Sequence, residues 1–133
     1  MHVDYAFLCD AATEHGGKIN ALGIGIDRLS AAALPATHAR LTFVARLAFA
    51  LEDAGVHRFR VRVVDADGRA IAGAIEGELR IVFAGEDRSA GVNLLVDLVN
   101  IEFKALGPHE IGLAIDGTEA VGLPLEVLRP DSA

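Results

Sequence analysis

The sequence is poor in several features that would otherwise narrow its function. Its one cysteine, Cys9, excludes an internal disulfide framework and favours a reducing compartment. Tryptophan is absent and aromatic residues make up 5% of the chain, so few side chains can stack on bases or sugars. No apolar run approaches the roughly 18 residues that span a bilayer, and no basic segment precedes the first apolar run. We therefore expect a cytoplasmic protein without a signal peptide or a membrane span.

Positive charge is also scarce. The 12 Lys and Arg residues stand against 19 Asp and Glu residues, which gives a formal net charge of −7. Nucleic acids and anionic lipid surfaces attract basic proteins, so we expect neither as a partner.

The sequence does contain enough apolar residues to form a hydrophobic core. The chain has 133 residues, of which 52% are hydrophobic and 23% are charged, a composition typical of globular proteins. This length suits one domain with a substantial core. We therefore expect a single domain over residues 1–133.

A repeated phrase organises the chain. Its first copy is GVHRFRVRVVDADG (residues 55–68) and its second is GPHEIGLAIDG (residues 107–117). Each copy opens with Gly-x-His, alternates apolar and polar residues, and closes at Asp-Gly. Alternation at period two predicts a half-buried strand. Asp-Gly after such a run predicts a hairpin turn, because type I′ turns need positive φ at both central residues. The phrase therefore predicts two β-hairpins of similar build.

Further alternating segments fill the rest of the chain. Residues 18–29 predict one strand, and residues 39–51 and 119–127 predict two more. In residues 92–103 the apolar phase changes near Asn100, which predicts a local bulge. The side chains expected to face the core are Val3, Tyr5, Phe7 and Cys9; Leu22, Ile24 and Ile26; Leu41, Phe43, Ala45, Leu47 and Phe49; Val121, Leu123, Leu125 and Val127.

These segments give about eight to ten short strands and no convincing helix. The predicted fold is all-β, an antiparallel two-sheet β-sandwich of immunoglobulin-like or similar form. A helix-rich mixed fold is the alternative that this pattern leaves open.

Histidine and aspartate at the ends of the phrase are the first candidates for chemistry. His57 and His109 occupy equivalent strand starts, where two neutral imidazoles would bind a metal if they lay close together. Asp65, Asp67 and Asp116 would supply oxygen ligands of the kind that calcium prefers. The alternatives are rim histidines that bond to the backbone and plain Asp-Gly turn chemistry. We favour these alternatives and expect no metal or other cofactor.

The remaining motifs point to no catalytic residue. Cross-strand ion pairs explain the charged rows better than a site for an anionic partner, because the whole molecule is acidic. These rows are Arg58, Arg60 and Arg62, and Glu76, Glu78 and Arg80. Nucleophile-elbow, P-loop and dinucleotide-binding motifs are all missing from the sequence. Cys9 is expected to be a small buried apolar residue.

Small residues on predicted outward faces are the one feature that favours a binding function. Ordinary solvent-facing strands carry Lys, Glu and Thr, whereas small apolar residues allow another surface to approach closely. We therefore predict an interaction face, with homo-oligomer formation or a protein partner as its use. Its residues are Ala21, Gly23, Gly25, Gly112, Ala114, Ala120 and Gly122.

Several segments together resemble a known family. They are YAFLCD (5–10), GKINALGI (17–24), LPATH (34–38), VDADG (64–68), NIEF with GPHEI (100–111) and LPLEV (123–127). This pattern, which covers nearly the whole chain, is similar to that of an uncharacterised bacterial family of small soluble proteins. The resemblance implies a β-sandwich and no known activity, and it assigns no functional residues.

The predicted function is thus a non-catalytic binding or interaction module that self-associates through the small-residue face. The alternative is a small metal-dependent or hydrolytic enzyme that uses the rim residues His57, His109, Asp65, Asp67 and Asp116. A structural part of a larger assembly is a third possibility.

Overall fold

The structure is a computed structural model that describes residues 1–130 and has ten strands and one short 3-10 helix. The prediction of an all-β fold is confirmed. The predicted domain also includes residues 131–133, which lie outside the described residues. In chain order the elements are β1 (His2–Cys9), β2 (Ala11–His15), β3 (Lys18–Leu22), β4 (Arg28–Ser30), β5 (Ala36–Ala50), η1 (Leu51–Asp53), β6 (Gly55–Val64), β7 (Ile75–Ile81), β8 (Ser89–Phe103), β9 (Gly107–Ile115) and β10 (Thr118–Leu128).

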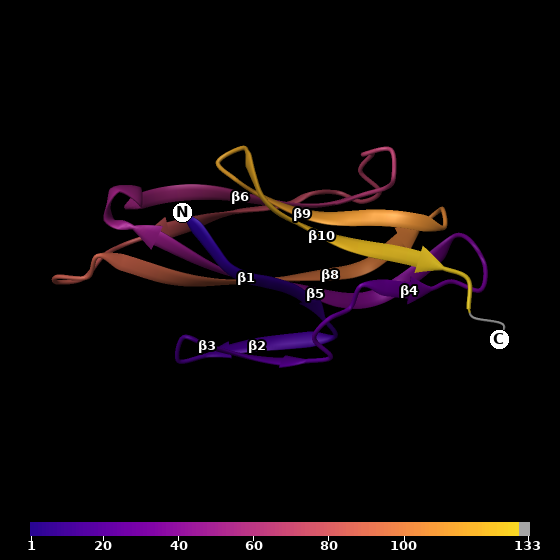
Figure 1. The fold of residues 1–133 in the computed structure, drawn as a ribbon, viewed down its shortest axis with the longest axis horizontal. Helices are drawn as coiled ribbons and strands as arrows, with labels where there is room; N and C mark the ends of the chain where they lie inside the picture. The colour runs from indigo at the N-terminus through magenta and orange to yellow at the C-terminus, as the bar shows by residue number, and fades with distance from the viewer. Residues whose placement is uncertain (131–133) are drawn as a thin grey trace.

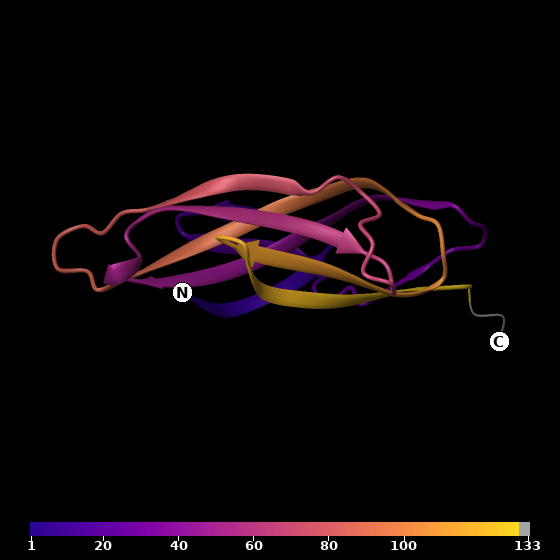
Figure 2. The ribbon, with the colours of Figure 1, turned by 90° about the horizontal axis from the view of Figure 1, so that it is seen from above.

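Three sheets make up the fold. One has the order β1-β5-β8 and a second has the order β4-β10-β9-β6-β7, while β2 and β3 form a separate hairpin. All neighbours are antiparallel except β4 and β10, which are parallel. The two larger sheets lie face to face, with the hairpin on the far side of the three-stranded sheet (Figure 1), and their strands cross at an angle (Figure 2). One sheet curls into half a barrel, so the immunoglobulin-like sandwich is not confirmed.

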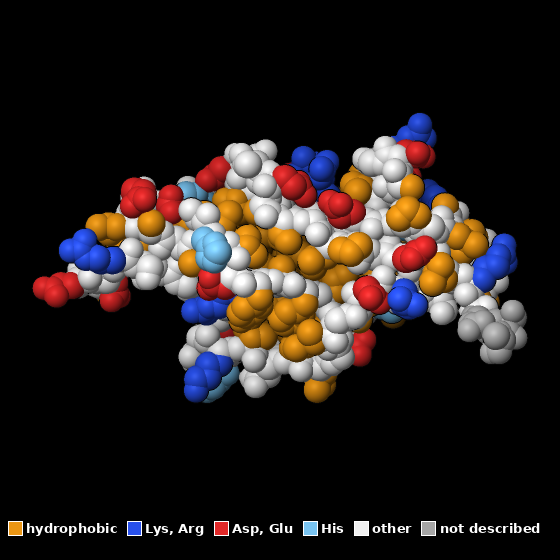
Figure 3. Space-filling view, in the orientation of Figure 1, with side chains coloured by type: hydrophobic (Ala, Val, Ile, Leu, Met, Phe, Trp, Pro, Cys, Tyr) orange, Lys and Arg blue, Asp and Glu red, His pale blue; other side chains and the backbone are white. Residues whose placement is uncertain are grey.

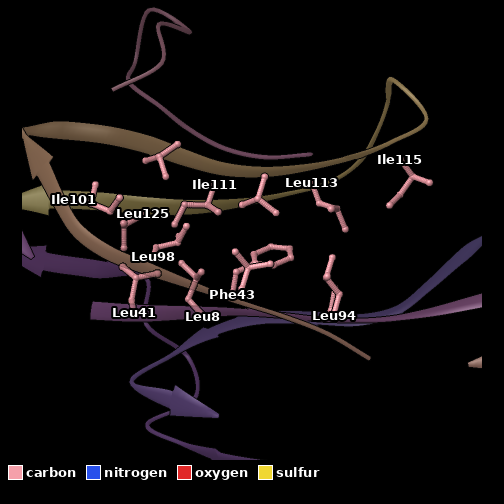
Figure 4. Close-up of a cluster of buried hydrophobic side chains, with 14 of the residues drawn as sticks. Leu8, Leu41, Phe43, Leu94, Leu98, Ile101, Ile111, Leu113, Ile115 and Leu125 are labelled. Atoms are coloured by element: carbon pink, nitrogen blue, oxygen red, sulfur yellow. The ribbon is translucent and has the colours of Figure 1, made fainter. Parts of the chain in front are cut away.

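The core fills the space between these two sheets (Figure 4). Alternation predicted it well where a strand has one buried face, because side chains along a strand point to opposite faces in turn. The five predicted inward residues of β5 are at most 1% exposed, and the four of β10 are buried or packed against the core. The largest fully buried side chains are Phe43, Phe49, Phe103, Leu8, Leu41, Leu47, Ile111, Leu113, Leu125, Val44, Val61 and Val127.

Both copies of the repeated phrase form strands, β6 and β9, and each pairs with the strand that follows it. The antiparallel pairing of both copies is therefore confirmed, but the type I′ turn predicted for the first copy is wrong, because residues 65–74 separate β6 from β7 and only Gly68 of the Asp67–Gly68 pair has positive φ. At the β9–β10 turn, Asp116 has φ +51° and Gly117 has φ +81°, the positive values that the type I′ prediction required. The two copies are also neighbours, with Phe59 opposite Ile115 and Val63 opposite Ile111 in antiparallel register.

The phase change near Asn100 is confirmed, without an extra residue on one strand. Ile101 and Phe103 are buried, and Asn100 has φ +53°. Pairing with β5 continues in the same register on both sides of Asn100. The left-handed backbone at Asn100 therefore turns Ile101 and Phe103 back toward the core. The sequence predicted that a β-bulge would do this.

The prediction for residues 18–29 is wrong. The strand ends at Leu22, and the chain bends at Gly23 and Gly25, whose φ values are +68° and +101°. Of the three side chains predicted to face inward, only Ile26 packs against the core, whereas Leu22 is 73% exposed and Ile24 is 61% exposed. Glycine allows the positive φ that reverses the chain here, which the alternating pattern concealed.

The predicted inward face of the first strand is wrong for Tyr5 and Phe7. The register of β1 shifts between Val3 and Tyr5, so Ala6 and Leu8 point into the core together with Val3. Tyr5 and Phe7 lie on the other face, under the hairpin. Cys9 is fully buried, as expected, and burial raises the pKa of its thiol.

Within residues 1–130, no helix is both long enough and apolar enough to cross a membrane.

Candidate functional site

His57, one of the predicted rim residues, is held by two hydrogen bonds. Its Nδ1 lies 2.6 Å from Oδ2 of Asp116, and its Nε2 lies 2.6 Å from the carbonyl oxygen of Asp53. A carboxylate and a carbonyl accept hydrogen bonds, so this geometry favours the imidazolium, in which both ring nitrogens donate. The Asp53 carbonyl, followed by the Asp116 carboxylate, raises the pKa of His57.

The two aspartates of this cluster are also fully engaged. The backbone N–H of Arg58 donates to Oδ1 of Asp116 at 2.9 Å, and together with His57 it lowers the Asp116 pKa. Oδ2 of Asp53 accepts from the N–H of Ala50 at 3.0 Å and from the Met1 amino group at 3.2 Å, and these bonds lower the Asp53 pKa. The cluster therefore ties η1, β6 and the β9–β10 turn together, and leaves no ring nitrogen for a metal or a substrate proton.

His109 lies at the other end of the sheet. Because β6 and β9 run antiparallel as neighbours, the start of one lies beside the end of the other. The condition for a shared metal, that the two equivalent histidines lie close together, is therefore not met. Nδ1 of His109 donates to the Gly107 carbonyl at 3.0 Å, and its ring packs edge-on against Phe103. Nε2 is buried without a partner among the described residues.

The acidic turn of the first copy has local hydrogen bonds. Oδ1 of Asp65 accepts from the backbone N–H groups of Asp67 and Arg69, at 2.9 and 3.0 Å. Gly68 has φ +78°, as turn chemistry requires. The turn interpretation is therefore confirmed, and nowhere in residues 1–130 do three His, Cys, Asp or Glu side chains gather in a way that could hold a metal.

The arginine row makes the cross-strand pairs that the sequence predicted. Arg60 lies 3.3 Å from Glu76 and Arg58 lies 3.4 Å from Glu78. These residues, with Arg62 and others, line a hollow of about 500 Å³ on the outer face of the five-stranded sheet. Because opposite charges compensate there, the row offers no strong attraction for an anionic partner.

The predicted small-residue face is not continuous in the structure. Gly23 and Gly25 lie in the bend after β3, away from the sheet that carries Gly112 and Gly122, and the register shift in β10 turns Ala120 toward the core. Gly122 pairs with Gly112 on the outer face of the five-stranded sheet.

Carboxylates cover that glycine pair. A Cβ on Gly112 would lie 2.6 Å from Oε1 of Glu119, and one on Gly122 would lie 2.5 Å from Oε1 of Glu110. Ala114 lies in the hollow of the arginine row, and Ala21 lies on β3, where it lines the space between the hairpin and β1. The seven residues therefore lie on separate surfaces.

An apolar groove under the hairpin is the feature that sequence reasoning missed. Tyr5 and Phe7 stack with ring centroids 6.0 Å apart, and Leu22 and Ile24 stand exposed beside them. Figure 3 shows apolar side chains gathered on the face that carries β1 and the hairpin. We call this surface, of about 870 Å³, the hairpin groove; its residues are Tyr5, Phe7, Ala11, Ala12, Thr13, Ile19, Asn20, Ala21, Leu22 and Ile24.

A signal for the groove was present in the sequence. Gly23 and Gly25 interrupt the apolar run of residues 18–29, and isolated glycines in a strand pattern often mark a break. Reading a break there would have placed Leu22 and Ile24 outside the core.

Comparison with known proteins adds one match. The model of a family described as a family of unknown function (DUF6941) matches residues 4–128. No curated protein matches the chain.

Proposed function

The chain belongs to DUF6941, a family of unknown function, and we propose that it is a non-catalytic interaction module that binds a protein partner through the hairpin groove. The observation that carries this proposal is the exposure of two large aliphatic side chains, Leu22 at 73% and Ile24 at 61%. Burying each against a partner would contribute about 1.5–3 kcal/mol. Contiguous apolar surface of this kind is typical of interaction sites.

The alternative function, an enzyme that uses His57, His109 and the turn aspartates, finds no support among the described residues. His57 uses both nitrogens in structural hydrogen bonds, and His109 lies at the opposite end of the sheet. The small-residue face also has less support than the hairpin groove, because glutamate carboxylates cover its central glycine pair. Ala21 alone belongs to both surfaces.

The setting of the partner follows from charge and cysteine use. A net charge of −7 supports a protein partner over nucleic acid or an anionic membrane. A single cysteine supports a reducing compartment, and we propose the cytoplasm.

Capture from the native lysate tests the proposal. We expect the tagged chain to retain a specific protein that the double variant Leu22→Glu, Ile24→Glu loses, because two carboxylates in the groove would have to be desolvated on binding. Both side chains are exposed, so the melting temperature should stay close to that of the wild type.

Val56→Glu is the matched control. Val56 is 48% exposed on β6 and does not line the hairpin groove, so this variant should capture the same protein as the wild type. If the double variant captures what the wild type captures, the hairpin groove is not the binding surface.

A further inference from the structure

The outer edge of β8 is a second surface without a partner, apart from the hairpin groove. β8 has 15 residues and ends the three-stranded sheet, where it pairs with β5 alone. In an antiparallel pair, alternate residues direct their N–H and C=O groups away from the neighbouring strand. Through residue 130, no further backbone hydrogen bond reaches β8. A long row of donors and acceptors therefore faces outward.

The other edges of the two larger sheets carry features that block strand pairing, and β8 has few of them. Charged side chains alternate along β7, the register of β1 shifts at a bulge, and β4 has only three residues. Lysine, proline, bulges and short length are the usual protections of an edge strand. β8 contains no lysine or proline, and its regular part runs over residues 89–99, before the turn in backbone conformation at Asn100.

We propose that β8 pairs with β8 of a second copy of this chain, antiparallel about a two-fold axis at Leu95. A two-fold contact joins a surface to itself, as strand pairing between identical edges requires. The product is one continuous sheet in which β1-β5-β8 of one copy meets β8-β5-β1 of the other. The inward side chains of β8, Leu94 and Val96 among them, stay on the core side of the joined sheet.

Charges are complementary in this register. Asp97 of one copy lies opposite Asn93 of the other, whose side chain already accepts from the Arg46 guanidinium at 2.7 Å. The Asp97 carboxylate, which already accepts from Arg40 at 3.2 Å and from Thr42 at 2.7 Å in its own chain, therefore approaches a second guanidinium, and no carboxylate of residues 89–99 faces another. Val99, which is 55% exposed, lies opposite Gly91, whose outer side the Arg46 guanidinium of the same chain already covers. Cross-strand pairs of this kind each contribute roughly 0.2–1 kcal/mol.

Covalent trapping tests the register directly. Directly opposed residues in antiparallel strands have Cβ atoms about 4.5–5.5 Å apart, close to the separation of a disulfide. We expect Leu95→Cys to form a disulfide-linked dimer under mild oxidation. The native Cys9 is fully buried and should not react. Val56→Cys, on an exposed part of β6, is the control and should remain largely uncrosslinked.

Light scattering at high micromolar concentration measures the mass of the protein in solution and is the second test. The wild type should have twice the 14.0 kDa chain mass, and Leu95→Lys, which places two ammonium groups on the axis, should be a monomer with a cooperative melting transition. A monomeric wild type, a dimeric Leu95→Lys variant or equal crosslinking of Val56→Cys would each overturn the proposal. The groove variant Leu22→Glu, Ile24→Glu should still dimerise, which separates this result from that of the lysate capture.

Discussion

Replacing Phe59 with alanine is expected to lower the free energy of unfolding by about 3 kcal/mol. Phe59 lies on the inner face of β6, packs against the core, and its ring covers Gly77 on the neighbouring strand β7. It is partly rather than fully buried, which places the loss at the lower end for phenylalanine truncation. Urea unfolding at a fixed protein concentration, followed by circular dichroism, measures it.

Two further variants control this prediction. Val56→Ala on the same strand removes a 48% exposed side chain and should change the free energy of unfolding by less than about 0.5 kcal/mol. Gly77→Ala should be destabilising alone, because its Cβ would overlap the Phe59 ring, and better tolerated together with Phe59→Ala. A loss below about 1 kcal/mol for Phe59→Ala would mean that the repeated phrase faces the other way.

Removing the His57 imidazolium is expected to abolish a pH-dependent part of the stability. A histidine with a raised folded pKa contributes fully below its unfolded pKa of about 6.5, and this contribution is lost as pH rises through the folded value. The Asp116 pKa is lowered, so its contribution is present above its unfolded pKa and lost as pH falls through the folded value. The His57–Asp116 pair therefore stabilises most in mildly acidic solution.

The comparison is between the wild type and His57→Gln. Near pH 6 we expect the variant to be less stable by about 1–2 kcal/mol, a modest value because the Asp116 side chain is 50% exposed and solvent screens the pair. The difference should shrink as pH rises above the folded pKa of His57. The free energies of unfolding of the two chains, measured by denaturant unfolding at several pH values, give this difference, because the chains differ only at residue 57. A difference that does not vary with pH would show that His57 is not charged in the folded protein.

The strand pattern could be predicted because a single buried face imposes alternation. The inward residues of β5 and β10 lie where alternation placed them, and the paired glycine and aspartate of the β9–β10 turn adopt the expected positive φ values. Cross-strand pairing of Arg60 with Glu76 followed from the same reasoning, since opposite charges on adjacent hairpin strands attract.

What could not be predicted is which strands become neighbours. His57 and His109 occupy equivalent places in the sequence, yet the antiparallel pairing of β6 with β9 puts them at opposite ends of the sheet. Nothing in either segment alone specifies that pairing. His57 lies instead beside Asp116, the turn residue of the other copy.

The hairpin groove was missed for a different reason. Alternation reports that a strand has an apolar face, but not whether that face meets the main core or a second surface. Tyr5 and Phe7 alternate as core residues would, and the bulge at the start of β1 turns them outward. Apolar residues on the outer face of a sheet therefore mark a second apolar surface that the alternating pattern by itself hides.

Photo-crosslinking from residue 22 tests the interaction module most directly. A photoreactive benzoylphenylalanine in place of Leu22 would stand exposed in the hairpin groove, and one in place of Val56 would stand exposed outside it. After illumination of cells that naturally make the protein, we expect discrete covalent adducts with another protein chain from residue 22 and none from residue 56. No adduct from residue 22, or the same adducts from both positions, would contradict a partner in the hairpin groove.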